Sequence, residues 1–597
     1  MILEPAALTE ITLAALLLLI LICFYCLRGK KWRINNGVLG LGFILVVAVE
    51  AEDANGAAVI DGDDYYYYCT VDIGSAGGIN EFLLAVPLSK CKERSPLYRK
   101  KFDGFTLRSA IPSSDKTWGN WAGTINLAPE AIFKPTSLTD LQDIVNLARK
   151  NGRTIRCAAE GHTESSLSVT NKYLVIINNL KNVQVLKDKH YGWVVTAEAG
   201  VSLNEIDNIL RINNPPLALS SATIPDFVRA AGVVATGSHG AKTTLSIMSD
   251  QVVSMKIVAA NGKVYEFCDT NNALEMQAAR VNLGLFGIIY SVTFRTEPMF
   301  NLRMTDTLPL AKDFLVPSVV KQLFESSDSL QIFYWPFNSF DSEATQPLDP
   351  TKDKMWVKQW VRSDENPTFS PEELAALRVY QNQSSLQANP QYQLLLNNPE
   401  YTPAISSAIW RQGPGLSPTS FVLQAPDAIH FLSPASKNIP VSFLGFGFKV
   451  DPDFKNFVKE LQAIINAIYA AAAQNSFPLN SISDARLIRS SHALLAPNFD
   501  PDPNAIYCFI DLVSYHFTPG FQTFASSFGQ KWIQNYNAKP HWAKEWEYVP
   551  NVKSYLSKAY KKQIKTFEKI REKYDPNKLF FDNESLQEIF NGALHYK

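Results

Sequence analysis

The hydrophobic and polar positions from about residue 120 onward predict short strands that alternate with helices. Residues 138–150 follow Pro135-Thr136-Ser137 and carry apolar side chains at helical spacing, so we expect a capped helix there. Residues 202–212 are a second helix candidate. Short β-branched runs bounded by turn residues predict strands at 154–158, 173–177 and 193–198.

The same pattern continues further along the chain. Strands are predicted at 252–259, 264–267 and 288–294, and Asn261-Gly262 is typical of the hairpin turn between the first two. The region from about 120 to 300 is therefore predicted to be α+β. A strongly helical pattern begins near Pro452 and ends near residue 477.

Two small-residue turns in this region each carry a histidine, in Gly161-His162-Thr163 and in Ala230-Ala231-Gly232-Val233-Val234-Ala235-Thr236-Gly237-Ser238-His239-Gly240. Glycine allows close approaches of the backbone, so that amide N–H groups can converge on a phosphate. Two such turns can clamp an extended phosphorylated cofactor between them. Neither matches GxGxxG or GxxxxGK[ST], so a Rossmann or P-loop nucleotide site is not indicated. A single glycine–histidine pair on a turn is more often structural than functional.

The N-terminal part contains a candidate membrane segment. Residues 11–27 form an unbroken apolar run, close to the minimum of about 17 residues for a membrane-spanning helix. The basic residues that follow would place the rest of the chain in the cytosol by the positive-inside rule. Residues 30–51, however, resemble a signal peptide, which would place it on the other side. We expect membrane attachment through residues 11–27, with a buried core helix as the alternative. Sidedness, including a secretory or mitochondrial location, stays open.

Composition excludes several other classes of protein. The net charge is −1, and no basic run interleaved with aromatic residues follows residue 40, so nucleic-acid binding is not expected. The seven cysteines show neither paired CxxC spacing nor a Cys/His cluster, so no metal site is expected. The length of 597 residues allows two or three domains.

Several segments, in order, resemble the PCMH-type FAD-binding domain of the vanillyl-alcohol-oxidase flavoprotein superfamily. They are Asn120-Trp121-Ala122-Gly123, Pro135-Thr136-Ser137, the two glycine–histidine turns, and Gly284-Leu285-Phe286-Gly287-Ile288. Pro540-His541-Trp542-Ala543-Lys544 and residues 571–580 are similar to the closing segments of the sugar-1,4-lactone oxidases, such as gulonolactone and arabinonolactone oxidases, and of the related alditol oxidases. The resemblance covers about residues 117–595.

This resemblance implies an α+β fold in which a two-subdomain FAD-binding domain is joined to an α+β cap domain that holds the substrate. The expected organisation is a membrane anchor or signal region at 1–51, an N-terminal extension at 52–116, the FAD-binding domain at 117–300, the cap domain at 301–535, and a segment at 536–597 that returns to the FAD-binding domain. Residues 350–425, rich in Pro, Gln, Asn and Ser, are expected to be an insertion over the cap.

The resemblance also assigns catalytic candidates. The lactone oxidases carry a Glu-x-Arg pair on one strand, and the matching segment here is Asp484-Ala485-Arg486. Residues two apart on a strand point to the same face, so both side chains can reach one pocket. Asp484 is one methylene shorter than the family's glutamate, and a solvated surface ion pair is an equally good interpretation. Arg489 and His492 are rival candidates. Lys544 matches the family lysine near flavin N1–C2.

The cofactor implied is FAD, covalently attached through His162, because family members with histidine at this position often carry an 8α-histidyl bond. Ala231 stands where the family places a small residue that controls access of oxygen to the flavin. Glycine there favours oxidase behaviour, and alanine leaves oxidase versus dehydrogenase open. The expected cofactor-binding residues are Gly161, His162, Thr163, Ala231, Gly232, Thr236, Gly237, His239, Gly287, Ile288, His541 and Lys544.

The resemblance implies an FAD-dependent enzyme of the D-arabinono-1,4-lactone oxidase class that oxidises a CH–OH group of a sugar lactone or polyol, with oxygen as the expected acceptor. Two alternatives remain. One is a flavin oxidase of a bulkier alcohol such as a sterol, which the expected insertion, the membrane segment and Asp484 would suit. The other is a non-catalytic flavin-fold membrane protein.

Overall fold

The computed structural model describes residues 56–61, 64–72, 81–87, 111–341, 348–416 and 419–595. The chain divides into two units, residues 1–105 and 106–597. In the first, three antiparallel strands pair in the order β1 (Gly56–Asp61), β2 (Asp64–Asp72), β3 (Glu81–Pro87). The predicted membrane segment at 11–27 lies outside the described residues. Within the described residues, none of the helices combines the length and hydropathy that crossing a membrane requires.

The second unit begins with a three-stranded parallel sheet in the order β6 (Ala131–Phe133), β8 (Tyr173–Ile176), β7 (Ile155–Ala158). Helix α2 (Leu138–Asn151) connects β6 to β7, and the predicted capped helix is confirmed. The hydroxyl of Ser137 accepts the N–H of Asp140 at 3.1 Å, and four apolar side chains of one face are buried. A small pair, β4 (Trp118–Gly119) and β5 (Asn126–Leu127), precedes the sheet.

A five-stranded antiparallel sheet follows, in the order β13-β12-β14-β10-β9. Its strands are β9 (Val183–Asp188), β10 (Gly192–Glu198), β12 (Val252–Val258), β13 (Val264–Cys268) and β14 (Ile288–Arg295). The helices of this region are α3 (Leu203–Ile212), α4 (Ala230–Ala235) and α5 (Asp269–Arg280). The predicted hairpin joins β12 to β13. The second small-residue segment, however, is not a turn throughout, because its first six residues form α4.

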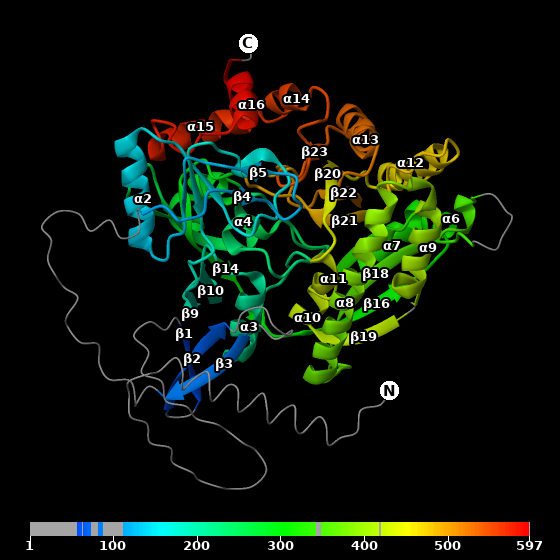
Figure 1. Ribbon diagram of the computed structural model, residues 1–597, viewed down its shortest axis with the longest axis horizontal. Helices are drawn as coiled ribbons and strands as arrows, with labels where there is room; N and C mark the ends of the chain where they lie inside the picture. The colour runs from blue at the N-terminus through cyan, green and yellow to red at the C-terminus, as the bar shows by residue number, and fades with distance from the viewer. Residues whose placement is uncertain are drawn as a thin grey trace, which may run out of the picture. The chain divides into compact units, whose positions relative to one another are not determined.

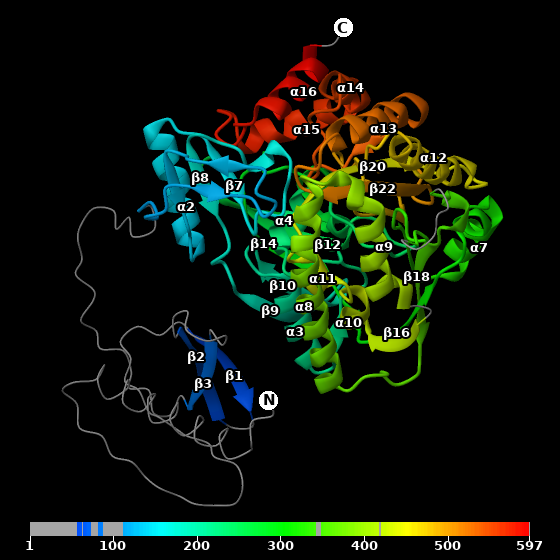
Figure 2. The same ribbon diagram turned by 45° about the vertical axis from the view of Figure 1, so that its right-hand side comes forward.

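The remaining sheet has eight strands, in the order β19-β16-β18-β17-β21-β22-β20-β23, and its neighbouring strands are antiparallel (Figures 1 and 2). The strands are β16 (Asn301–Thr307), β17 (Ser329–Tyr334), β18 (Met355–Ser363), β19 (Thr419–Gln424), β20 (Val441–Lys449), β21 (Ser483–Arg489), β22 (Ile506–Tyr515) and β23 (Lys539–Pro540). Helices associated with this sheet are α6 (Ala311–Phe314), α7 (Pro317–Ser326), α10 (Ala425–Ile429), α11 (Ser433–Ser436), α12 (Lys455–Ala472) and α13 (Phe521–Tyr536). A short pair, β11 (Leu217–Ala218) and β15 (Glu297–Pro298), lies before it in the chain.

Residues 350–425 contribute to the sheet as well as to its surroundings. Strand β18 pairs with both β16 and β17, and β19 forms the edge beside β16. Between them the chain forms α8 (Pro371–Leu395) and α9 (Thr402–Gln412). The part that stands apart from the sheet is therefore shorter than the expected insertion and is largely helical.

The C-terminal helices α14 (Val552–Ala559), α15 (Lys561–Tyr574) and α16 (Glu584–His595) return to the beginning of the second unit (Figures 1 and 2). The N–H of Ile155 in β7 donates to Leu579 O at 2.9 Å, and Thr154 and Thr170 donate to Asp582. One continuous apolar core runs from α2 through the large sheet to α16. This arrangement brings the loop after β7, the loop after α4 and the eight-stranded sheet to one cavity.

Candidate active site

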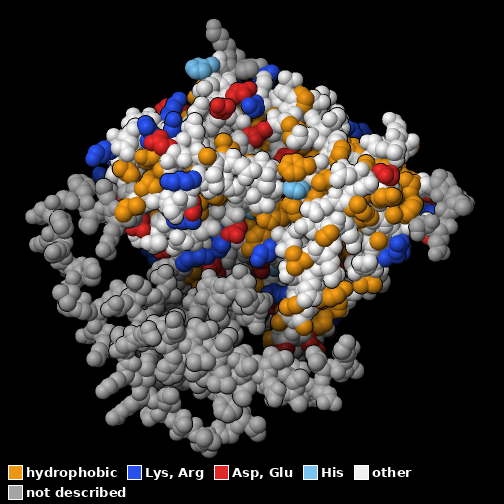
Figure 3. Space-filling model, viewed as in Figure 1, with side chains coloured by type: hydrophobic (Ala, Val, Ile, Leu, Met, Phe, Trp, Pro, Cys, Tyr) orange, Lys and Arg blue, Asp and Glu red, His pale blue; other side chains and the backbone are white. Residues whose placement is uncertain are grey.

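The functional candidates converge on a cavity of about 1130 Å³. Its walls are the loop after β7, helix α4 with the loop after it, the strands of the eight-stranded sheet, and helices α8 and α9. Figure 3 shows hydrophobic side chains gathered over α8 and α9 on one face of the molecule. Of the residues expected to act in catalysis or cofactor binding, all except Gly237 line this cavity.

The loop after β7 places His162 in the cavity wall. Gly161 has φ +77°, and a side chain there would place its Cβ 3.2 Å from the Trp118 ring, so glycine suits this turn. The His162 ring lies 4.5 Å from the Trp121 ring and 5.4 Å from the Phe227 ring, between centroids. Its Nδ1 is buried with no hydrogen-bond partner among the described residues. Burial lowers the pKa of His162 to about 3, so the imidazole is neutral.

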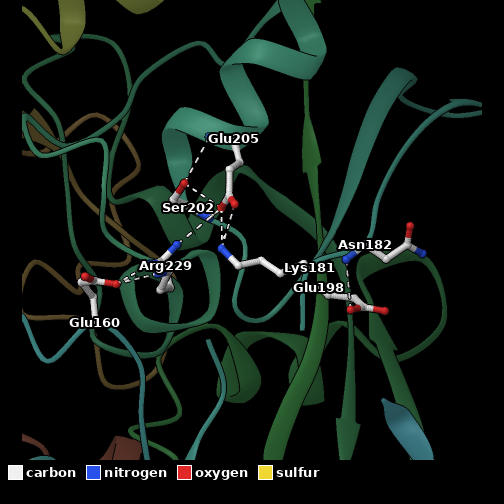
Figure 4. A network of polar contacts seen from close by, with 7 residues as sticks. All are labelled: Glu160, Lys181, Asn182, Glu198, Ser202, Glu205 and Arg229. Carbon is white, nitrogen blue, oxygen red and sulfur yellow. Dashed lines mark hydrogen bonds and ion pairs between the residues drawn. The ribbon is translucent and has the colours of Figure 1, made fainter. Parts of the chain in front are cut away.

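Arg229, at the N-terminus of α4, ties this loop to the rest of the FAD-binding region (Figure 4). Its guanidinium contacts Glu160 at 2.5 Å and Glu205 of α3 at 3.4 Å. Glu205 also accepts from Lys181 at 2.8 Å and forms a capping box with Ser202. Glu160 therefore makes an ion pair that joins the His162 loop to the N-terminus of α4.

The second loop buries His239 between the FAD-binding region and the large sheet. The His239 ring lies 4.2 Å from Phe509 of β22 and 5.7 Å from His541, between centroids. Its Nδ1 lies 3.0 Å from Gly240 O, and burial lowers the pKa of His239 to about 3. Ala231, Gly232 and Thr236 line the cavity from α4 and its end, and Gly287 and Ile288 do so from the start of β14.

Asp484 and Arg486 of β21 form a buried ion pair rather than a solvated one. Arg486 Nη2 lies 2.6 Å from Asp484 Oδ2, and Asp484 is 2% exposed. The amide of Gln331 on the neighbouring strand β17 donates to both carboxylate oxygens, at 3.0 and 2.9 Å. Asp484, which is one methylene shorter than the family's glutamate, thus accepts from two donors, Arg486 and Gln331. Arg486 also lines the cavity.

The rival candidates lie elsewhere. Arg489 donates to Thr243 O and Asn504 O, at 3.0 and 2.9 Å. His492 is exposed. Neither residue belongs to the cavity wall that the described residues form.

Lys544 follows β23 on a turn that Trp542 holds by donating its indole N–H to Leu495 O at 2.6 Å. The ammonium lies 3.6 Å from the centroid of the Phe443 ring and 4.0 Å from Glu164 Oε1. Burial raises the pKa of Glu164 to about 8, so this carboxyl is mostly protonated at neutral pH. The positive charge of Lys544 is therefore available to the cavity.

Sequence reasoning missed three polar residues of the site: Gln331, Glu164 and Asp511. Asp511 had a usable signal, because it is the one carboxylate in the apolar strand Ile506–Tyr515. Gln331 and Glu164 had none, because their roles depend on neighbours more than 100 residues away along the chain.

The residues present fit FAD. Two loops with small side chains, the neutral imidazole of His162 with its unpartnered ring nitrogen, and the partly buried ammonium of Lys544 all line the cavity. An extended phosphorylated cofactor needs backbone N–H donors at such loops, and its redox ring needs positive charge near the atoms that become negative on reduction.

Comparisons with known proteins point to the same cofactor. Residues 129–267 match the FAD binding domain family, and residues 292–589 match the D-arabinono-1,4-lactone oxidase family. L-gulonolactone oxidase of Bos taurus is 31% identical over 210 residues, which are 35% of this chain and 45% of the relative. D-arabinono-1,4-lactone oxidase of Saccharomyces cerevisiae is 30% identical over 237 residues, which are 38% of this chain and 43% of the relative. The matches thus span under half the length of these relatives.

Solved structures show the same fold. Cholesterol oxidase from B. sterolicum superposes with a TM-score of 0.64 over 80% of this chain and 96% of that chain, at 16% sequence identity. At this identity the likeness establishes the fold alone. The two family matches show that the chain belongs to the PCMH-type FAD-binding flavoproteins, with an FAD-binding domain followed by a domain of the D-arabinono-1,4-lactone oxidase family.

Proposed function

We propose that the chain is an FAD-dependent oxidoreductase that oxidises a CH–OH group of a sugar 1,4-lactone or a polyol, with molecular oxygen as the electron acceptor. The observation that carries the proposal is that the buried Asp484–Arg486 pair, Lys544 and the two glycine–histidine loops line one cavity. The similarity to gulonolactone and arabinonolactone oxidases supports this substrate class.

The roles follow from charge and position. Bound FAD would supply the acceptor for the hydride that leaves the substrate carbon. Arg486 orients the substrate hydroxyl and stabilises negative charge on its oxygen. Asp484 and Gln331 fix the guanidinium for this task, since Gln331 holds the carboxylate to which Arg486 binds. Lys544 stabilises the negative charge that develops during reduction.

We further propose that His162 carries the covalent bond to FAD. Its imidazole is neutral, its Nδ1 has no hydrogen-bond partner in the described part of the chain, and the ring is held between Trp121 and Phe227. A neutral ring nitrogen with a free lone pair is what nucleophilic attachment requires. In acid-denatured protein, the yellow colour is expected to stay with wild-type protein and to be released from His162→Ala. The exposed His190→Ala is the control.

The activity is tested by measuring peroxide formation with a panel of aldonolactones, alditols and sterols. The proposal predicts turnover with D-arabinono- or L-gulono-1,4-lactone or with an alditol, and its loss in Arg486→Met. A flavin-loaded protein that turns over no alcohol would support the non-catalytic alternative. Turnover with an artificial electron acceptor but without peroxide would indicate a dehydrogenase, and Ala231→Gly then tests whether the side chain limits oxygen access.

A bulkier alcohol is the second candidate substrate, and the far end of the cavity favours it. Leu377, Tyr380 and Ala388 of α8 line this end, together with aromatic side chains of the sheet. The indole N–H groups of Trp335 and Trp356 are buried there without a partner among the described residues. Such a wall suits an apolar group with a hydrogen-bond acceptor. Ala388→Trp is expected to lower kcat/KM for a sterol or other bulky alcohol much more than for a lactone.

A further inference from the structure

Asp511 is a second buried carboxylate in the active-site cavity. It lies in β22 and pairs directly with Asp484 of β21, and both side chains line the cavity. Residues directly opposite each other on antiparallel strands have Cβ atoms about 4.5–5.5 Å apart. Two carboxylates therefore share one end of the substrate space, and the roles given above use only one of them.

The two carboxylates have different surroundings. Asp484 accepts a hydrogen bond from the guanidinium of Arg486 at 2.6 Å. It also accepts from Gln331, whose amide nitrogen lies 3.0 Å from one carboxylate oxygen and 2.9 Å from the other. These charged and polar donors bind both carboxylate oxygens of Asp484. A carboxylate held in this way is suited to fix an arginine and poorly suited to exchange a proton with a substrate.

Strand β20, which pairs with β22 on the side away from β21, leaves room for the Asp511 side chain. Gly445 of β20 is the partner of Asp511 across that pair of strands. A Cβ atom at residue 445 would lie 2.3 Å from Asp511 Oδ1 and 3.4 Å from Lys544 Cγ. Any side chain there would displace the carboxylate, so glycine at this position keeps Asp511 beside the Lys544 turn and at the cavity wall.

We propose that Asp511 is the catalytic base that accepts the proton of the substrate hydroxyl, while Asp484 serves to position Arg486. The proposal rests on the proposed function. In the step, the C–H bond breaks and its electron pair leaves as hydride to the flavin, which is the oxidant. The O–H bond breaks and its proton passes to a carboxylate oxygen of Asp511. The oxygen electron pair forms the second carbon–oxygen bond, so the alcohol becomes a carbonyl by losing two electrons.

The charges around Asp511 suit a group that titrates near neutral pH. Asp484 and Arg486 face it from β21, Lys544 from the turn after β23, and Glu164 from the loop after β7. Burial and the negative charge of Asp484 raise the pKa of Asp511 to about 7, while Arg486 and Lys544 oppose that rise. A general base works best when its pKa lies near the operating pH.

The test measures how fast substrate reduces the flavin anaerobically as a function of pH, in wild type, Asp511→Asn, Asp484→Asn and Glu164→Gln. Below about pH 7, the wild-type rate should fall about tenfold per pH unit, because only ionised Asp511 accepts the proton. Asp511→Asn should remove this pH step and slow reduction about 10²- to 10⁴-fold. Glu164→Gln, a matched change of another buried carboxyl of the cavity, should keep the step.

A readout independent of turnover is the infrared carboxyl band of the flavin-loaded protein. In wild type, Asp511 should lose its proton near pH 7 and Glu164 near pH 8, and the band that titrates near pH 7 should be absent from Asp511→Asn but present in Glu164→Gln. Asp484→Asn should weaken substrate binding and slow reduction while a pH step remains. The proposal is overturned if wild type shows no step, or if Asp511→Asn keeps both the step and the wild-type rate. If no alcohol reduces wild type at any pH, the proposed function fails instead.

Discussion

Lys544 lies 4.0 Å from the carboxyl of Glu164 and 3.6 Å over the ring of Phe443. A lysine so close to a glutamate would ordinarily be neutralised by it. Burial instead raises the pKa of Glu164 to about 8 and keeps most of that carboxyl protonated at neutral pH, so Glu164 does not neutralise the ammonium. A charge left free in a water-poor cavity stabilises a developing anion more strongly than it would in water.

Replacing Lys544 with methionine shortens the side chain by one atom and removes its charge. We expect substrate-driven flavin reduction to slow about 10²- to 10³-fold while flavin stays bound. Stopped-flow absorbance measures the rate, and the flavin-to-protein absorbance ratio measures occupancy. Lys562→Met, at an exposed position of α15, is the control. An unchanged reduction rate in Lys544→Met would contradict the role given to this lysine.

Glu164 also yields a pH prediction. Its pKa is raised from 4.5 to about 8 in the folded chain, so the folded state keeps a proton that the unfolded state loses above pH 4.5. Glu164 therefore lowers the free energy of unfolding progressively as pH rises from about 4.5 to about 8. Glu164→Gln should gain stability relative to wild type over this window. Urea unfolding at a series of pH values checks it, and a difference that is constant with pH would refute it.

At the residue scale, the resemblance to the lactone oxidases identified Asp484 and Arg486 as candidates, and their spacing of two along one strand predicted that both side chains lie on the same face. The pattern left open whether they were solvated, and a carboxylate one methylene short put their reach in doubt. The structure resolves the first point, because Asp484 is buried and accepts a hydrogen bond from Gln331, which lies 153 positions away in the chain. The spacing of residues along one strand does not reveal contacts with segments so far away in the chain.

Helices and strands could be predicted where the residues that determine them lie within one short segment. Helix α2 carries its cap and its apolar stripe within one segment, and the β12–β13 hairpin carries its turn residues between its strands. Strands β18 and β19 lie in a stretch rich in Pro, Gln, Asn and Ser, and they are strands because they pair with β16 and β17. Pairing between distant segments decides their structure, and the local sequence pattern does not reveal it.

Strand β7 is connected to three distant segments through one side chain. Buried Arg156 donates hydrogen bonds to Leu167 O, Leu283 O and Phe580 O, at 2.8, 2.9 and 3.0 Å. Arg156→Met removes the donor shared by these carbonyls, and we expect a loss of about 3 kcal/mol or more in the free energy of unfolding. Arg153→Met, which removes a surface ion pair with Glu130, should cost at most about 1 kcal/mol. Denaturant unfolding compares the two, and equal losses would contradict the account.

On the scale of the whole molecule, the candidate catalytic residues belong to the unit of residues 106–597, and the candidate membrane segment belongs to the unit of residues 1–105. We propose that the chain is membrane-associated through residues 11–27. Removal of residues 1–51 should then move the protein from the membrane fraction to the supernatant while flavin content and turnover persist. Fractionation of full-length and truncated chains tests this, and full-length protein found only in the supernatant would contradict it.

The cavity joins parts of the chain that are far apart in sequence: a loop near residue 161, a helix near residue 231, a strand pair at residues 484 and 511, and a turn near residue 544. The core that packs between these parts is continuous, so the site depends on the folding of the entire second unit. For this reason family resemblance identified the cofactor more readily than any single stretch of sequence could.

The central claim is that an alcohol substrate reduces a flavin held between these loops, beside Arg486. The most direct measurement is the anaerobic bleaching of the visible flavin absorbance of the purified holoprotein after addition of D-arabinono-1,4-lactone, L-gulono-1,4-lactone or an alditol. The account predicts bleaching in wild type and bleaching slowed about 10²- to 10³-fold in Arg486→Met at equal flavin content. Flavin that stays oxidised with every one of these compounds, or Arg486→Met that bleaches as fast as wild type, would contradict it.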